Sequence, residues 1–260
     1  MSLNRGILYI VYGDKADKVL ERSRASVEKW HPELEVDVVR LDAEHPAGLL
    51  RKAEMGELSP FDETLFLDAD TVLLDRVDYL FDQAQRYGIA AAICECPWAR
   101  RYQGSGLPLE SVEWNTGVIA WAKSEAALEQ RAWPPKFFAA WKRAAAAVDS
   151  SITWVSDQSK GSLVRMASND QASFTAALLE CDINPGAVPI NYNLRPQWHR
   201  TFFGPVKVWH DYADPPAKLL EWADYYRQPG AIVQYHDLAN LASPKMDVLY
   251  KPESEPAPGC

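Results

Sequence analysis

The first 67 residues alternate between short apolar runs and segments of helical periodicity. The run Gly6–Tyr12 is bounded by turn residues, which is typical of a strand buried on both faces. In chain order we expect a strand, a helix, a strand, a helix and a strand at residues 6–12, 16–30, 34–41, 47–58 and 64–67. This β-α-β-α-β order predicts an α/β fold: a single Rossmann-like, mixed and mostly parallel sheet with helices on both faces.

The rest of the sequence continues the alternation less regularly. We expect helices at 77–87, 122–148, 171–180 and 218–226, and strands at 89–94, 118–121, 188–190, 206–209 and 232–235. The stretch 97–113 is rich in Gly, Pro and Arg and has no periodicity, so we expect a long functional loop there. With 260 residues, 47% of them hydrophobic, we predict one domain over residues 1–245, followed by a disordered Pro-rich tail at 246–260.

Two carboxylates, Asp68 and Asp70, follow the third predicted strand with the small Ala69 between them. In an extended segment, side chains at i and i+2 point the same way, so both carboxylates can face one point. There they repel each other unless a cation lies between them, and hard oxygen ligands suit Mg²⁺ or Mn²⁺. Ligands of such sheets bind outside the carboxyl ends of the strands, which is where this pair lies. The alternative is that one Asp caps a helix and the other is a solvated loop residue.

Composition excludes several classes of function. The formal net charge of -9 and the pI of about 5.1 argue against a nucleic-acid or acidic-membrane surface. The four cysteines lack the paired spacing of a zinc site and do not form a disulfide framework. The sequence has neither the long apolar core of a signal peptide nor a transmembrane segment, so we expect a cytoplasmic protein with reduced thiols.

Several sequence blocks, taken in order, resemble glycogenin and the family 8 glycosyltransferases. The acidic pair lies in a segment similar to the Asp-x-Asp segment of that family, and Lys52 stands sixteen residues before Asp68, where the family carries a donor-contacting cation. The further matching blocks are Asn115-Thr116-Gly117-Val118, Asn169-Asp170-Gln171, Asn191-Tyr192-Asn193-Leu194, and the run from Phe203 to His210. Together they cover most of residues 6–212.

The resemblance implies a glycosyltransferase A-type fold and transfer of a hexose from a nucleotide-diphosphate sugar, with a uridine diphosphate sugar as the expected donor. It implies Mn²⁺ (or Mg²⁺) as the cofactor, retention of anomeric configuration, and an acceptor (glycan, protein or small molecule) that the sequence does not identify. The implied metal ligands are Asp68, Asp70 and His210, with His236 as the rival for the third position. The implied donor-binding residues are Tyr12, Asp14, Lys52, Asp68, Ala69, Asn115, Thr116 and Gly117. The implied catalytic residues are Asp170 and Gln171.

The sequence departs from the family in two places. The Lys-Pro-Trp that follows the metal-binding His in the family is missing here, where Asp211 to Pro216 follows instead. Lys218 or a residue of the Arg100-Arg101 loop is the candidate replacement for the diphosphate-binding lysine. There is also no counterpart of the segment of glycogenin that carries its self-glucosylated tyrosine. As acceptor contacts we consider Trp98, Arg100, Arg101, Tyr102 and Trp198.

Other classes of protein remain open at this point. The acidic segment also fits the first motif of haloacid-dehalogenase-type phosphatases, although that family carries the motif on its first strand and adds a later acidic pair. A sugar-1-phosphate nucleotidyltransferase would open with a Gly-rich loop and an Arg, which Ile10–Lys15 does not provide. A non-catalytic nucleotide-sugar-binding module would keep the acidic pair.

Overall fold

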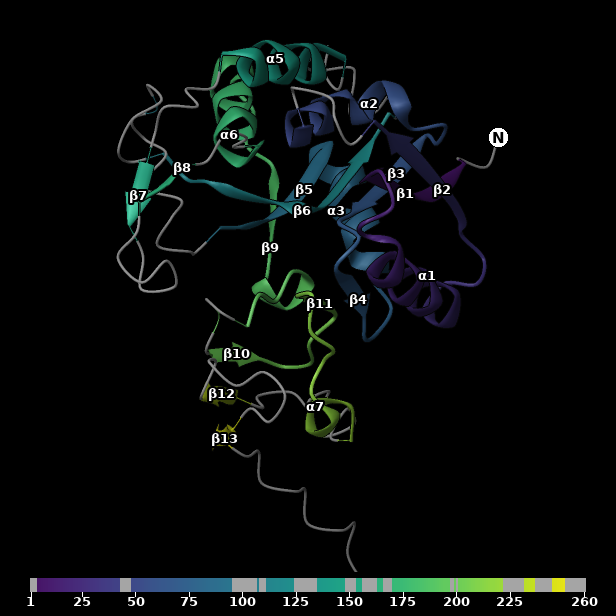
Figure 1. The fold of residues 1–260 in the computed structure, drawn as a ribbon, viewed down its shortest axis with the longest axis vertical. Coiled ribbons are helices and arrows are strands. Elements are labelled where there is room, and N and C mark those ends of the chain that lie inside the picture. The colour runs from purple at the N-terminus through teal and green to yellow at the C-terminus, as the bar shows by residue number, and fades with distance from the viewer. Residues whose placement is uncertain are drawn as a thin grey trace, which may run out of the picture.

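A computed structural model describes most of the chain (Figure 1). The described residues are 4–42, 48–94, 107, 111–123, 135–147, 153–155, 163–165, 170–196, 199, 201–221, 232–236 and 245–250. None of the helices among these residues is long and apolar enough to cross a membrane.

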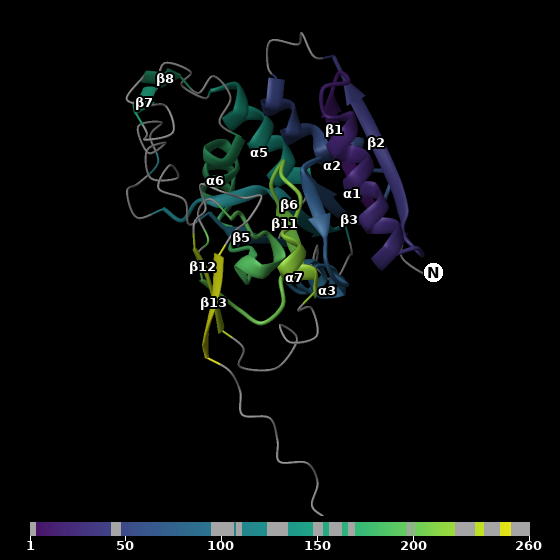
Figure 2. The same cartoon turned by 60° about the horizontal axis from the view of Figure 1, so that its bottom comes forward.

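A six-stranded sheet forms the centre of the fold, in the order β2-β1-β3-β6-β5-β9 (Figures 1 and 2). Its strands are β1 (Arg5–Tyr12), β2 (Glu35–Leu41), β3 (Glu63–Leu67), β5 (Ile89–Ile93), β6 (Trp114–Ala122) and β9 (Gly186–Val188). β1 pairs in parallel with β2 and β3, and β5 pairs in parallel with β9. β6 lies antiparallel between β3 and β5. The prediction of a mixed, mostly parallel sheet is therefore confirmed.

Helices cover both faces of this sheet. They are α1 (Asp17–Trp30), the 3-10 helix η1 (Gly48–Glu54), α2 (Met55–Leu58), α3 (Asp78–Tyr87), α5 (Pro135–Ala146) and α6 (Asp170–Cys181). Alternate residues of β1 enter different cores: Ile7 and Tyr9 pack with α1 and α3, while Leu8 and Ile10 pack on the face of α5 and α6. Because both faces are covered, the strand is apolar throughout instead of alternating.

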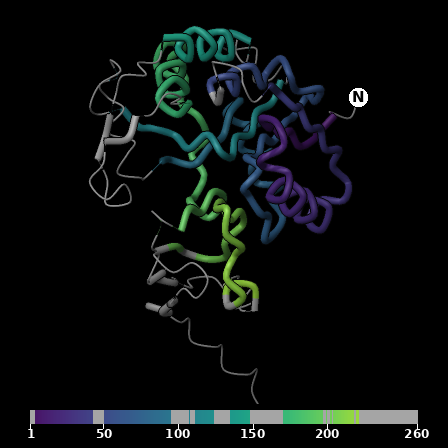
Figure 3. Tube along the Cα trace, viewed as in Figure 1, coloured from purple at the N-terminus to yellow at the C-terminus, as the bar shows by residue number. Residues whose placement is uncertain are grey.

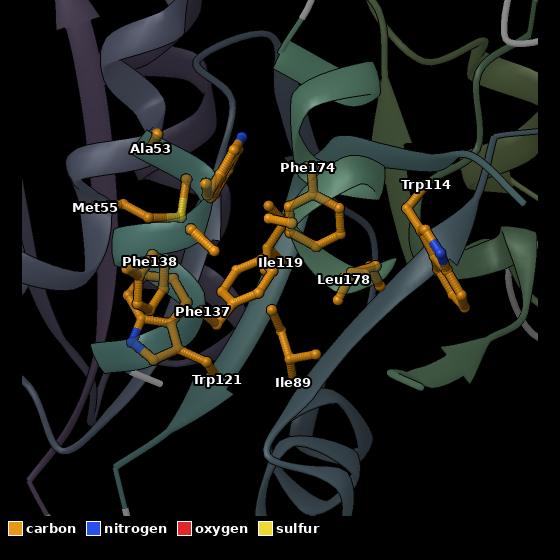
Figure 4. Packing of buried hydrophobic residues seen from close by; sticks show 14 of the residues in the cluster. Ala53, Met55, Ile89, Trp114, Ile119, Trp121, Phe137, Phe138, Phe174 and Leu178 are labelled. Carbon is orange, nitrogen blue, oxygen red and sulfur yellow. The ribbon is translucent and has the colours of Figure 1, made fainter. Parts of the chain in front are cut away.

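The α5–α6 face holds a cluster of aromatic rings (Figure 4). Trp141 and Phe174 meet edge to face with ring centroids 4.9 Å apart, and Phe137 contacts both. Trp121 from β6 packs against Phe138 in the same cluster. The quadrupoles of aromatic rings favour this edge-to-face geometry. Trp121 and Trp141 therefore belong to the core.

Smaller elements follow α6 along the chain (Figure 3). They are the 3-10 helix η4 (Ile190–Tyr192), β10 (Thr201–Phe203), β11 (Val208–His210), α7 (Ala217–Glu221), β12 (Ile232–His236) and β13 (Lys245–Tyr250). β10, β12 and β13 form a three-stranded sheet, and β11 pairs antiparallel with β4 (Thr71–Leu73).

Several segments differ from the expectations. Within the helix expected at 122–148, the structure has α5 from 135 to 146, and residue 122 belongs to β6; the short strands β4 and β10 were not expected. The polar stretch 149–166, for which the sequence predicts no element, contains the antiparallel pair β7 (Thr153–Val155) and β8 (Leu163–Arg165). The tail expected to be disordered from residue 246 begins inside β13, so its first residues are extended and paired, and 251–260 lie outside the described residues.

Candidate metal and donor site

The acidic pair lies in a tight turn between β3 and β4. The Asp68 backbone N–H donates to the Gly117 carbonyl at 2.8 Å, which ends the pairing of β3 with β6. The backbone N–H of Thr71 then donates to the Asp68 carbonyl at 3.1 Å, and the Thr71 hydroxyl donates to the same oxygen at 2.8 Å. The segment is therefore a turn and not the extended stretch assumed above, and the turn brings the two carboxylates together.

His210 completes a cluster with these two carboxylates. It lies opposite Thr71 in the β4–β11 pair, and its Nε2 is 3.4 Å from Asp70 Oδ1 and 3.8 Å from Asp68 Oδ2. One ligand atom from each of the three residues lies within 4.8 Å of the others. Two carboxylate oxygens and an imidazole nitrogen form a mixed donor set that suits Mn²⁺.

A glycine leaves the space in which these groups meet. A Cβ added at Gly117 would lie 2.2 Å from His210 Cε1 and 2.9 Å from Asp68 Oδ2. The imidazole can therefore approach the carboxylate only because residue 117 has no side chain. The residues present thus fit a divalent cation in both their chemistry and their spacing.

The two carboxylates have different pKa values. Burial raises the pKa of Asp68, and the lysine beside it does not fully offset this effect. Burial acts in the same direction on Asp70, but the charge and hydrogen bond of a protonated His210, together with a backbone hydrogen bond and Lys52, outweigh it and lower the pKa of Asp70 to about 2. Asp70 therefore stays ionised across the physiological range, as a metal ligand must.

Lys52 connects the acidic turn to α6. Its side chain is 6% exposed, and its Nζ lies 2.7 Å from Asp68 Oδ1 and 3.1 Å from Asp170 Oδ2. Burial alone would lower the pKa of Lys52, but Asp170 and Asp68 outweigh it, so the pKa lies above its usual range. The lysine is therefore a fixed positive charge between the acidic turn and the first residue of α6.

Residues 115–117 lie beside the start of α6. The Thr116 hydroxyl donates to Asp170 Oδ2 at 2.6 Å, and the Asn115 amide donates to Gln171 Oε1 at 3.1 Å. Asp170 thus accepts from both a hydroxyl and the Lys52 ammonium. The blocks that are distant in sequence meet at one end of the sheet.

A cavity of about 410 Å³ opens beside the acidic turn. It is lined by Ile10, Val11, Tyr12, Lys15, Ala16, Lys52, Asp68, Ala69, Asp70 and Tyr212. Burial raises the pKa of Tyr12 to about 12, so this tyrosine stays neutral at the end of β1. Asp14 is exposed in the turn after β1 and does not line the cavity.

Sequence reasoning did not single out two of the residues that line this cavity. Lys15 lies in the turn before α1, and Tyr212 follows His210 by two residues yet is 73% exposed. The only available signal for Tyr212 was an aromatic residue close to a candidate ligand, in a segment that departs from the family pattern.

Several candidates cannot be placed. His236 ends β12 and Lys218 lies in α7, and the side chains of both are outside the described part of the structure. The acceptor candidates Trp98, Arg100, Arg101, Tyr102 and Trp198 also lie outside it, as does Asn169 of the block Asn169-Asp170-Gln171. Their roles stay predictions.

A second group of possible ligands, His31, Glu33 and Asp78, is already satisfied by the protein. Arg76 donates to Glu33 and to both oxygens of Asp78 at 2.7–2.9 Å. His31 Nε2 accepts the backbone N–H of Val77 at 2.9 Å, so its lone pair is used. This cluster joins the end of α1 to the start of α3 and does not fit a metal ion.

No protein-family model matches the chain, and no curated protein matches it by sequence. Solved structures do resemble it. The galactosyltransferase LgtC, solved in complex with donor and acceptor sugar analogs, matches 81% of this chain and 88% of its own at 14% identity, with a TM-score of 0.50. Mouse xyloside xylosyltransferase 1 matches 80% of this chain and 97% of its own at 13% identity, with a TM-score of 0.51. The chain therefore has the glycosyltransferase A-type fold, as the sequence blocks implied.

Proposed function

We propose that this protein is a metal-dependent glycosyltransferase that moves a hexose from a nucleotide-diphosphate sugar, with uridine as the expected nucleoside, to an acceptor hydroxyl. The observation that carries the proposal is the convergence of Asp68, Asp70 and His210, because the two carboxylates also line a cavity large enough for a nucleoside. The fold shared with two glycosyltransferase structures supports it. A phosphatase of the haloacid-dehalogenase type has no comparable support.

Asp68, Asp70 and His210 would hold Mn²⁺ or Mg²⁺. When bound there, such an ion supplies Lewis-acid stabilisation of the negative charge that grows on the leaving diphosphate. The cavity at the end of β1 would hold the nucleoside, with Tyr12 offering an aromatic face to the base. Lys52 would offset donor phosphate charge, because its ammonium is fixed beside the acidic turn.

The reaction centre would lie at the start of α6. In a retaining transfer, the bond from the anomeric carbon to the diphosphate breaks and the acceptor oxygen bonds on the same face, while the acceptor proton passes to the departing diphosphate. Asp170 would stabilise positive charge at the anomeric carbon, and Gln171 would lie beside that carbon. The hydrogen bonds from Thr116 and Lys52 hold the Asp170 carboxylate in place for this role.

The test is release of nucleoside diphosphate from a panel of nucleotide sugars with Mn²⁺, with and without candidate acceptors. We expect metal-dependent release that Asp70→Ala reduces by at least two orders of magnitude, since it removes a ligand that makes charge-assisted contacts. Asp82→Ala removes an exposed carboxylate from α3 and is the matched control, which should keep the activity. Release of inorganic phosphate from phosphomonoesters without a nucleotide sugar would contradict the proposal. Donor binding without turnover, across all acceptors tried, would indicate a binding module instead.

A further inference from the structure

A chain of side-chain amides joins the two ends of the candidate site. His210 Nδ1 lies 2.7 Å from Asn193 Oδ1, and Asn193 Nδ2 donates to Asn115 Oδ1 at 2.7 Å. Asn115 Nδ2 donates in turn to Gln171 Oε1 at 3.1 Å. Asn193, Asn115 and His210 are 1%, 4% and 9% exposed, so these groups depend on one another for hydrogen bonds.

A backbone N–H determines which groups donate and which accept along this series of hydrogen bonds. The Gly117 N–H donates to Asn115 at 2.9 Å, and a backbone N–H can only donate, so the atom that receives it is the Asn115 carbonyl oxygen. The Asn193 group that meets the same oxygen must then be its NH₂. Asn193 consequently turns its own carbonyl oxygen toward His210.

This direction determines which ring nitrogen of His210 carries the hydrogen. A carbonyl oxygen only accepts, so Nδ1 is the protonated nitrogen of the neutral ring, and the lone pair is on Nε2. Nε2 is the atom that faces Asp70 and Asp68. The imidazole is thereby held in the one tautomer that can coordinate a cation between the two carboxylates.

We propose that Asn193 is a positioning residue that keeps His210 in its metal-binding tautomer and orientation. This inference rests on the proposed function, because it assigns His210 to the metal. Hydrogen-bond partners of the far nitrogen of a ligating histidine typically change metal affinity or activity 10–100-fold when they are removed. The same series of hydrogen bonds holds the Gln171 oxygen against Asn115.

The first test measures Mn²⁺ binding directly, by electron paramagnetic resonance of the free ion. We expect Asn193→Ala to weaken Mn²⁺ binding about 10–100-fold. Asn193→Asp keeps an oxygen that accepts from Nδ1 but sets a second carboxylate oxygen against the Asn115 carbonyl oxygen, so it should restore part of the affinity. Asn191→Ala is the matched control: it removes a neighbouring amide that donates to the Pro205 carbonyl at 2.8 Å, and it should leave Mn²⁺ affinity unchanged.

Equal Mn²⁺ affinity in Asn193→Ala and the unsubstituted chain would overturn the inference and leave the proposed function intact. Equal losses in the Ala and Asp variants would also overturn it, because packing and not the accepted hydrogen bond would then be responsible. If the unsubstituted chain binds no Mn²⁺, the metal role in the proposed function fails and the inference fails with it.

A second measurement is made on the unsubstituted chain. Nitrogen-15 NMR of this chain loaded with the diamagnetic ion Mg²⁺ shows which ring nitrogen carries the hydrogen, and His210→Asn identifies the signals of His210. We expect the hydrogen on Nδ1 and an unprotonated Nε2. A neutral ring with its hydrogen on Nε2 would contradict the assignment.

Discussion

At the scale of single residues, the candidate metal site depends on a glycine, Gly117, whose lack of a side chain leaves room for the ligands. Gly117 separates Asn115 and Thr116, which contact α6, from the part of β6 that pairs with β3. A Cβ at this position would lie so close to His210 and Asp68 that any other residue type would displace at least one of them. One short segment of β6 therefore contacts both the candidate metal ligands and the proposed reaction centre.

Gly117→Ala should disable the site while the chain still folds. The added methyl group would displace His210 or Asp68, so we expect Mn²⁺ affinity and transferase activity to fall at least tenfold. Mn²⁺ titration with a circular-dichroism check of the fold measures this.

Gly186→Ala is the matched control for this prediction. A Cβ there would meet the Tyr87 ring at 2.7 Å, away from the site, so it imposes a milder clash without touching a ligand. We expect it to lower stability and leave Mn²⁺ affinity unchanged. Equal affinity losses in the two variants would mean that general strain, and not the space beside His210, is responsible.

Some residues of the site could be predicted from sequence and others could not. Asp68 and Asp70 are visible as two charges directly after an apolar run, and chemistry alone associates them with a cation. We expected the two carboxylates to face one point because the segment would be extended, whereas in the structure a turn brings them together. Asn193 carries no such signal. The role of a buried asparagine depends on its hydrogen-bond partners, and those of Asn193 lie in β6 and β11, which are distant in sequence or defined only by the fold.

At the scale of elements, α1 holds the acidic turn and the segment after His210 together. Arg22 donates to the carbonyls of Asp211, Tyr212 and Asp70 at 2.6–3.4 Å and to the Asp214 carboxylate at 2.9 Å. One turn further along α1, Ser26 accepts the backbone N–H of Leu73 at 2.9 Å. The helix thus ties β4 and the end of β11 to the main sheet.

Arg22→Ala should loosen this connection. Hydrogen bonds from a charged group are worth about 1.5–3 kcal/mol each, so we expect the Mn²⁺ and donor KM values to rise about tenfold or more. Arg22→Lys should recover only part of the loss, because lysine lacks the planar fork that reaches several carbonyls at once. Initial rates across Mn²⁺ and donor concentrations measure the effect.

Arg24→Ala is the control on the same helix, since Arg24 is exposed and makes no contact with the site. It should leave both KM values unchanged. Unchanged kinetics in Arg22→Ala would show that the turn holds its shape without α1.

Elements were predictable where their patterns were long. The strands and helices of residues 5–41 have apolar spacing over seven or more residues, and the structure places them within one residue of the expected bounds. β4, β7 and β8 have three residues each, too few to show a period. The β4–β11 pair is also defined by a partner more than 130 residues away, which local pattern does not reveal.

At the scale of the whole molecule, the candidate site lies where two sheets meet. Asp68 follows β3 of the six-stranded sheet, while His210 ends β11 of the two-stranded sheet. A cation held by both would cross-link segments that are otherwise joined by the turn and by α1. The overall topology was predictable from the β-α-β order, whereas the antiparallel insertion of β6 depends on long-range pairing.

Mn²⁺ should therefore stabilise the folded chain. At a free concentration of 100 times the Kd, binding to the native state alone adds about 2.7 kcal/mol, which corresponds to a rise in Tm of about 5–10 °C. Thermal unfolding with Mn²⁺, and again after excess EDTA, measures the shift and its reversal. The shift should be absent in Asp70→Ala, and a shift of the same size in that variant would place the ion elsewhere.

The salt bridges of Lys52 have a consequence for the order in which ligands bind. Lys52 pairs with Asp68 and Asp170, and Asp70 lies close to Asp68, so this cluster of four ionised side chains has an excess of two negative charges when His210 is neutral. A diphosphate entering alone would meet repulsion, whereas a divalent cation that binds first cancels this excess of negative charge.

We therefore expect uridine diphosphate to bind much more tightly with Mn²⁺ than with EDTA in calorimetry, and equal affinities would show that Lys52 and other cations suffice. Binding in this protein would then be ordered, with the metal ion before the donor. The metal concentration would control donor binding as well as donor cleavage.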